Sequence, residues 1–216
     1  MDFRFPYFLI LLFGICSGII YHIKLSKSSK TILILLIFTL LFEGLSYYFT
    51  NRGLSNYFLY NLFIPIQFLI ITISFIYETN QKLFILFFVL LLIFFVFHLL
   101  EKSIITTFFT QILLFNLLFI SYYCLYFLYK LLKIDQEVKF QSFPFFWISV
   151  GFLMFSVLNL VEYGVYNILH LNNLSKSTII IFNNIRIYSN YLLYLIITYS
   201  FFVKPLSLAD YAKSGK

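Results

Sequence analysis

Charged side chains are scarce in this sequence, and their scarcity argues against a water-soluble domain. Asp, Glu, Lys and Arg make up 11% of the 216 residues, whereas 62% are hydrophobic and 23% are aromatic. Soluble domains are about half apolar and about one-quarter charged. This chain therefore has too little polar surface to cover itself in water, and its composition predicts a lipid bilayer as the solvent.

Histidine and cysteine are also sparse, and the motifs of most enzymes are missing. The sequence has three His and two Cys, and we find no HExxH, GxSxG, phosphate-binding loop, kinase signature or zinc framework. Cys16 and Cys124 fall in apolar runs, where a free thiol usually serves for packing. His98, Glu101 and His170 are expected at one membrane surface, but three such groups are a weak metal signal. We predict no enzyme activity and no metal centre, and the cofactor is unknown.

Long apolar runs dominate the chain instead. A membrane-spanning helix takes about 20 mostly apolar residues, and seven runs of roughly that length are separated by short polar gaps. They cover approximately residues 5–23, 31–50, 55–77, 83–98, 104–132, 143–169 and 177–203. The runs are too long for barrel strands and do not alternate as lipid-facing strands do. We predict an all-α fold, a single transmembrane domain over residues 1–216 with about seven spans.

The basic residues are distributed unevenly between the two ends of the predicted helices. Ten of the 15 Lys and Arg residues fall on one side, four fall on the other, and Arg186 lies within a span. Because cytoplasmic connections accumulate positive charge, we predict the N-terminus outside and the C-terminus in the cytoplasm. The net charge of +7 is spread over helix ends. This pattern favours contact with anionic lipid headgroups, and we expect no nucleic-acid partner.

Three ionisable residues, Glu43, Glu162 and Arg186, lie inside the predicted spans. Such groups are costly in a bilayer and usually face the bundle interior or a water-filled cavity. With a rise of about 1.5 Å per residue, each lies roughly 9 to 14 Å from the outer end of its helix. The outer halves also hold Asn61, Gln111, Asn159, Asn183 and Asn184. The inner halves are nearly bare of strongly polar groups.

Helical spacing gathers several of these side chains on shared faces. Asn183, Arg186 and Asn190 follow an i, i+3, i+7 pattern, and Asn159 and Glu162 are three residues apart. We predict an outward-facing cavity whose ligand-binding residues are Glu43, Asn61, Asn159, Glu162, Asn183, Arg186, Tyr57 and Tyr163. Two acids against one base favour a cationic or hydrogen-bond-donating ligand. In the structural alternative, Arg186 pairs with one glutamate and the amides join helices.

Two glycines of the first run have the spacing of a helix-packing motif. Gly14 and Gly18 form a GxxxG pattern, which lets two helices approach closely. The pattern predicts either packing inside the bundle or dimerisation, and the sequence does not decide between them.

Four stretches of the sequence together resemble a group of uncharacterised seven-helix integral membrane proteins from Bacteroidota. They are LLFEGLSYYF, YNLFIPIQF, FWISVGFLMF and NYLLYLIITYSF, and the likeness extends over most of the chain. In that group an acid tends to follow the YN pair on the third helix. Gln67 stands where we would expect it here, which puts the role of a third-helix carboxylate in doubt. The resemblance implies a bacterial inner-membrane location and a sensory role beside two-component partners.

These observations predict an integral membrane sensor or receptor-like module. It would bind a small ligand from the outer side and signal through a partner protein, because the polar groups cluster outward and no output domain is evident. The alternative is a small transporter or ion-translocating protein, which needs a polar path to the inner face. The bare inner halves disfavour that path, although Ser121 and Tyr122 keep it open.

Overall fold

The computed structural model describes residues 4–133, 139–170 and 176–203, and all regular structure within these ranges is helical. It comprises seven α-helices and two short 3-10 helices: α1 (Arg4–Ile20), η1 (His22–Lys24), α2 (Lys27–Asn51), α3 (Tyr57–Thr79), α4 (Leu83–Glu101), α5 (Thr110–Leu132), η2 (Phe140–Ser142), α6 (Pro144–His170) and α7 (Lys176–Ser200). The predicted all-α class is confirmed for this part of the chain. Each of the seven apolar runs overlaps one of the α-helices.

A local cap explains why α2 begins earlier than its apolar run. The helix begins at Lys27, four residues before the predicted start. The Ser26 hydroxyl accepts a hydrogen bond of 3.2 Å from the Ser29 backbone N–H. Such a cap satisfies one of the free donors at a helix N-terminus, so the polar segment that precedes the run is already helical.

The fifth helix differs most from its predicted bounds, because α5 begins at Thr110 and not at residue 104. The preceding segment is held by the Asn61 side chain of α3. Its Nδ2 donates to the carbonyl groups of Ile104 (3.1 Å) and Thr107 (2.8 Å), and its Oδ1 accepts from the Phe109 N–H (2.9 Å). These bonds satisfy backbone groups that a helix would have paired internally.

Five of the helices, α2 to α6, are long and apolar enough to cross a membrane. α1 is a shorter apolar helix, and α7 is 25 residues long but includes several polar side chains. An all-helical bundle with helices this apolar is typical of an integral membrane protein.

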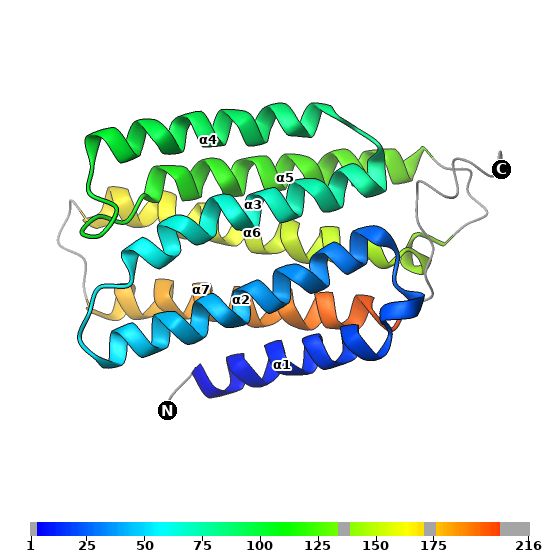
Figure 1. Ribbon diagram of the computed structural model, residues 1–216, viewed down its shortest axis with the longest axis horizontal. Helices are drawn as coiled ribbons and strands as arrows, with labels where there is room; N and C mark the ends of the chain where they lie inside the picture. Colours follow the sequence, from blue (N-terminus) through cyan, green and yellow to red (C-terminus); the bar gives the residue numbers. More distant parts are fainter. Residues whose placement is uncertain (1–3, 134–138, 171–175, 204–216) are drawn as a thin grey trace.

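Six helices form a closed ring, and one lies outside it. The axes run side by side (Figure 1). Around the ring, α1 contacts α2 and α7, α3 contacts α2 and α5, and α6 contacts α5 and α7. α4 packs outside the ring on α3 and α5. Exposed apolar side chains of α4, such as Leu86, Leu90 and Phe97, give it a face suited to lipid.

The two glycines of α1 permit its close approach to both neighbours in the ring. A Cβ atom at Gly14 would lie 2.6 Å from Thr198 Oγ1 of α7, and one at Gly18 would overlap the side chain of Leu33 on α2. Neither distance is possible without a shift of the neighbours. The structure therefore assigns the GxxxG spacing to packing within one bundle, the first of the two alternatives that the sequence left open.

We call one end of the ring the basic end, because Lys24, Lys27, Lys82, Lys130 and Lys133 lie there. At this end α2, α4 and α6 begin, and α1, α3, α5 and α7 finish (Figure 1). We call the opposite end of the ring the cavity end.

Aromatic side chains of α3, α4, α5 and α6 pack together in the half of the bundle nearer the basic end. The Tyr123 ring lies 5.5 Å from that of Phe68 and 4.2 Å from that of Phe84. The Phe75 ring lies 5.5 Å from that of Tyr123 and 4.9 Å from that of Phe145. These five side chains, which we call the aromatic core, are at most 1% exposed. Their edge-to-face and offset contacts pack this half of the bundle densely.

Candidate functional site

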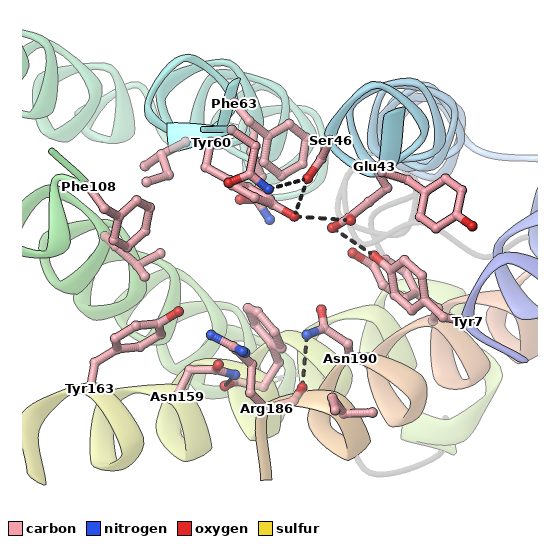
Figure 2. Close-up of a pocket in the computed structure, with 18 of the residues that line it drawn as sticks. Tyr7, Glu43, Ser46, Tyr60, Phe63, Phe108, Asn159, Tyr163, Arg186 and Asn190 are labelled. Carbon is pink, nitrogen blue, oxygen red and sulfur yellow. Dashed lines mark hydrogen bonds between the residues drawn. The ribbon is translucent and has the colours of Figure 1, made fainter. Parts of the chain in front are cut away.

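A cavity of about 630 Å³ lies inside the ring at the cavity end. Its lining comes from α1, α2, α3, α5, α6 and α7, together with Phe108 just before α5. Figure 2 shows the hollow between the side chains of α2 and α3 on one side and those of α6 and α7 on the other. Ligand cavities typically measure about 300–1,000 Å³, so a small organic molecule fits.

One wall of the cavity, the acidic wall, is organised around Glu43 of α2. The Glu43 carboxylate accepts hydrogen bonds from the hydroxyl groups of Tyr7 (3.4 Å) and Tyr60 (3.2 Å). The Ser46 hydroxyl donates to the Tyr60 hydroxyl (3.0 Å), and Asn56 Nδ2 donates to the Ser46 hydroxyl (2.7 Å). These bonds link α1, α2 and α3 and orient the carboxylate at the cavity surface (Figure 2).

The facing wall, the basic wall, is organised around Arg186 of α7. Arg186 lines the cavity and is an exposed residue. Its guanidinium interacts with the Tyr163 hydroxyl and with the Glu162 carboxylate, both of α6. The Asn190 side chain donates a hydrogen bond of 2.9 Å to the Arg186 carbonyl. The wall therefore presents a positive charge whose position is set by neighbouring polar groups (Figure 2).

Between the two walls the lining is largely aromatic and apolar. The described lining as a whole has 23 residues, of which seven are Tyr and four are Phe. The apolar members are Phe8, Phe63, Ile64, Phe108, Leu113, Leu117, Phe155 and Ile187. Gln67, Leu117 and Tyr194 are the lining residues furthest from the cavity end on α3, α5 and α7. One turn further toward the basic end, Ile71 of α3 and Ile197 of α7 are 0% exposed, so buried apolar side chains close the floor.

Five of the eight predicted ligand-binding residues line this one cavity. They are Glu43, Tyr57, Asn159, Tyr163 and Arg186. Asn159 also donates to Ser189 Oγ of α7 (3.0 Å), so this amide both joins helices and faces the cavity. The side chain of Asn183 lies outside the described residues. Ligand binding by the five lining residues stays a prediction.

Asn61 and Glu162 do not line the cavity. Asn61 is 1% exposed, and its amide is engaged by the segment before α5. This is the helix-joining role of the structural alternative. Glu162 is 5% exposed, and its Oε2 has no hydrogen-bond partner in the described part of the chain. Its carboxylate interacts electrostatically with the neighbouring Arg186. Glu162 therefore helps to position the basic wall without lining the cavity itself.

The acidic wall contains residues that the sequence analysis missed. On α3, Tyr57, Tyr60, Ile64 and Gln67 all line the cavity, and their i, i+3, i+7, i+10 spacing places them on one helix face. Asn61 lies on the neighbouring face. Following the whole stripe from Tyr57 would have identified Tyr60 and Gln67 as cavity residues.

The basic end has a buried acid, so the expectation that the inner halves are nearly bare of strongly polar groups is wrong. Glu78 is 1% exposed, and its Oε2 accepts a hydrogen bond of 2.6 Å from the Ser28 hydroxyl. The Ser74 hydroxyl donates to the Ser28 carbonyl (2.9 Å). Hydropathy predicts Glu78 in a polar connection, but α3 continues to Thr79 and Glu78 is buried within the bundle.

His98 is engaged by protein groups. Its Nε2 lies 2.6 Å from Gln111 Oε1, and its Nδ1 lies 3.0 Å from the Phe94 carbonyl. Among the residues that the structure describes, no group of three or more His, Cys, Asp or Glu could hold a metal ion. Both ring nitrogens of His98 are therefore occupied by contacts with Phe94 of its own helix and with Gln111 of α5.

Comparisons with known proteins do not identify the chain further. No protein-family model, curated protein or solved structure matches it. Function is therefore inferred from the cavity and its two charged walls.

Proposed function

We propose that the chain crosses a bacterial inner membrane seven times, with the cavity end outside and the basic end in the cytoplasm. All seven helices lie side by side in one bundle (Figure 1). The lysines at the basic end fit the cytoplasmic excess of positive charge. In this arrangement α1 and α7 are spans as well, and the polar face of α7 is directed into the cavity, away from lipid.

In this orientation the protein is a sensor or receptor-like module that binds a small polar ligand from the outer side. The observation that supports this proposal is the placement of Glu43 and Arg186 on facing walls of one cavity. Charged side chains inside a membrane protein are costly unless they serve a site or pair within the bundle. Here both reach a space large enough for a ligand.

A sensor fits better than a transporter because the cavity is closed below its floor. Beyond the last lining residues of α3 and α7, the side chains of Ile71 and Ile197 are 0% exposed. Ligand binding would change the spacing of α2 and α3 relative to α6 and α7. A signalling partner protein would then detect that change at the cytoplasmic side.

Transport is the second candidate, and the buried Glu78 favours it. Its carboxylate and the Ser28 and Ser74 hydroxyls give the basic end a polar cluster of its own. A transporter needs polar groups on both sides of its closed barrier, and Glu43 and Glu78 satisfy that requirement. The buried side chains between these two glutamates would then have to separate during a transport cycle.

Cysteine labelling in intact cells tests the membrane arrangement. In a Cys16→Ser, Cys124→Ala background, Tyr57→Cys should react with a membrane-impermeant maleimide, because Tyr57 lines the cavity and is 43% exposed. Lys82→Cys, an exposed position at the basic end, should react only after the membrane is permeabilised. The reverse pattern would overturn the proposed orientation.

Flux measurements separate the two candidate functions. We expect proteoliposomes containing the protein to move neither protons, followed with an internal pH dye, nor a mixture of labelled amino acids. We expect a signalling subunit to copurify with the chain from its native membrane. Flux that disappears in Glu43→Gln but persists in the exposed control Glu101→Gln would replace the sensor by the transporter.

A further inference from the structure

The charges of the cavity lining point to a class of ligand. Among the described residues of the lining, Glu43 and Arg186 are the two that carry formal charge, and they have opposite signs. We infer that the ligand is a small zwitterion, whose cationic group is bound by the acidic wall and whose anionic group is bound by the basic wall. This inference rests on the proposed binding function and specifies its ligand.

Each charge is oriented by partners on its own wall. On the acidic wall, the Tyr7 and Tyr60 hydroxyls donate to Glu43 from α1 and α3. On the basic wall, Arg186 interacts with Tyr163 and Glu162 of α6. A site held in place before the ligand arrives loses less free energy to side-chain ordering. The two charges are therefore presented as a preformed pair of opposite binding points.

A ligand with a single charge is a poor match for such a cavity. A cation that binds at Glu43 places its charge in the same low-dielectric space as Arg186, and an anion at Arg186 faces Glu43. In both cases the ligand is attracted by one wall and repelled by the other, and the juxtaposition of like charges costs free energy. A zwitterion satisfies both, and selection against single charges follows from the same two residues.

The rest of the lining indicates the body of the ligand. Phe63, Phe108 and Phe155 line the cavity and supply apolar surface. Tyrosine hydroxyls can bond to ligand polar atoms at the rims of that surface. A short aliphatic or aromatic body with one charged group at each end fits this arrangement and the volume of about 630 Å³.

The test uses three matched series of probes on the purified full chain in lipid nanodiscs. Unbranched ω-amino acids of increasing chain length are compared with diamines and with dicarboxylates of the same lengths, and binding is measured by calorimetry. The amino acids should bind at least about tenfold tighter than both other series, because one charged hydrogen bond is worth that much. Affinity should peak at the chain length that matches the separation of the walls.

Two charge-neutralising variants test which wall of the cavity binds which charged end of the amino acid. Glu43→Gln should weaken the best amino acid about 10- to 100-fold and remove the discrimination against dicarboxylates. Arg186→Gln should weaken it similarly and remove the discrimination against diamines. The exposed Glu101→Gln and Arg52→Gln, outside the cavity lining, are the charge-matched controls and should bind as the unmodified chain does. A variant that does not fold is replaced by Glu43→Asp or Arg186→Lys, which should shift the preferred chain length.

The outcomes separate this inference from the function on which it rests. Diamines or dicarboxylates that bind as tightly as the amino acids would overturn the zwitterion and leave a ligand-binding cavity in place. If no series binds although Tyr57→Cys is labelled from outside, the zwitterion is overturned while the proposed orientation stands. If no series binds and the label enters from the cytoplasm, both proposals fail.

Discussion

The two ends of the helix ring are made from the same helices, yet they differ in what fills them. The basic end is filled by aromatic rings that are at most 1% exposed, whereas the cavity end encloses about 630 Å³ of space. Each end also has a glutamate with hydroxyl donors. Glu78 is 1% exposed at the basic end, and Glu43 is half-buried beside the cavity. The comparison indicates that dense packing is concentrated in one half of the bundle, whereas the other half holds an open cavity with two opposite charges.

The largest loss in the free energy of unfolding is expected from Phe75→Ala in the aromatic core. Phe75 is fully buried against the rings of Tyr123 and Phe145, so its removal leaves a cavity and should lower the free energy of unfolding by about 3–5 kcal/mol. Phe108→Ala on the cavity wall should cost about 1 kcal/mol, since its ring is already half-exposed. Unfolding in detergent by titration with sodium dodecyl sulphate measures both.

Equal losses for these two variants would show that the cavity wall is as tightly packed as the core. If Phe75→Ala does not accumulate in the membrane, the pair Phe75→Leu and Phe108→Leu should keep the same order of losses. Circular dichroism would confirm that helix content is unchanged before unfolding.

The second largest loss of stability is expected when the buried glutamate at the basic end loses its hydrogen-bond donor. Ser28→Ala removes the hydroxyl that lies 2.6 Å from Glu78 Oε2, and the site is closed to water because both residues are 1% exposed. Loss of a hydrogen bond to a charged group should lower the free energy of unfolding by about 1.5–3 kcal/mol. Ser103→Ala, at an exposed position, is the matched control and should change little.

The same variant also tests whether the two ends act separately. The labelling rate of Tyr57→Cys should be the same with and without Ser28→Ala. A change in that rate would show that the polar cluster at the basic end is coupled to the cavity, as a transporter requires.

A smaller effect is expected where α1 packs closest to its neighbours. Gly14→Ala would place a methyl group 2.6 Å from Thr198 Oγ1, so α1 and α7 must separate slightly. Overpacking typically costs about 1–3 kcal/mol, and a single methyl group should fall near 1 kcal/mol. Gly44→Ala on α2 meets nothing within 4 Å and should stabilise its helix by up to about 1 kcal/mol. Losses of the same size at both glycines would contradict the close approach of α1.

Much of the fold could be predicted from the sequence, because hydropathy alone defines each helix of a membrane bundle. Glu43 and Arg186 could be predicted as cavity residues because ionisable groups in spans face the bundle interior. The amides were harder to place. A polar stripe gives a helix face, but it does not say which neighbour that face meets, and so Asn61 was assigned to the cavity although it holds the chain before α5.

Glu78 was missed for a different reason. Hydropathy ends a span where polar residues begin, and the pair of Glu78 and Thr79 was therefore placed in a connection. The structure continues α3 through both residues, because Ser28 on the neighbouring helix offers the carboxylate a donor. A contact between residues 50 positions apart leaves no periodic pattern in either segment.

The smallest effect is expected from Tyr60→Phe, which is the counterpart of Ser28→Ala at the cavity end. It removes a hydroxyl that donates to Glu43 over 3.2 Å. The cavity is large enough to admit water, and a water molecule can replace this donor at little cost. The free energy of unfolding should fall by less than about 1 kcal/mol, as measured by the same titration. Tyr122→Phe, on the exposed face of α5, is the control. A loss as large as that of Ser28→Ala would mean that Glu43 is sealed from water, and the cavity would then be unable to receive a ligand from outside.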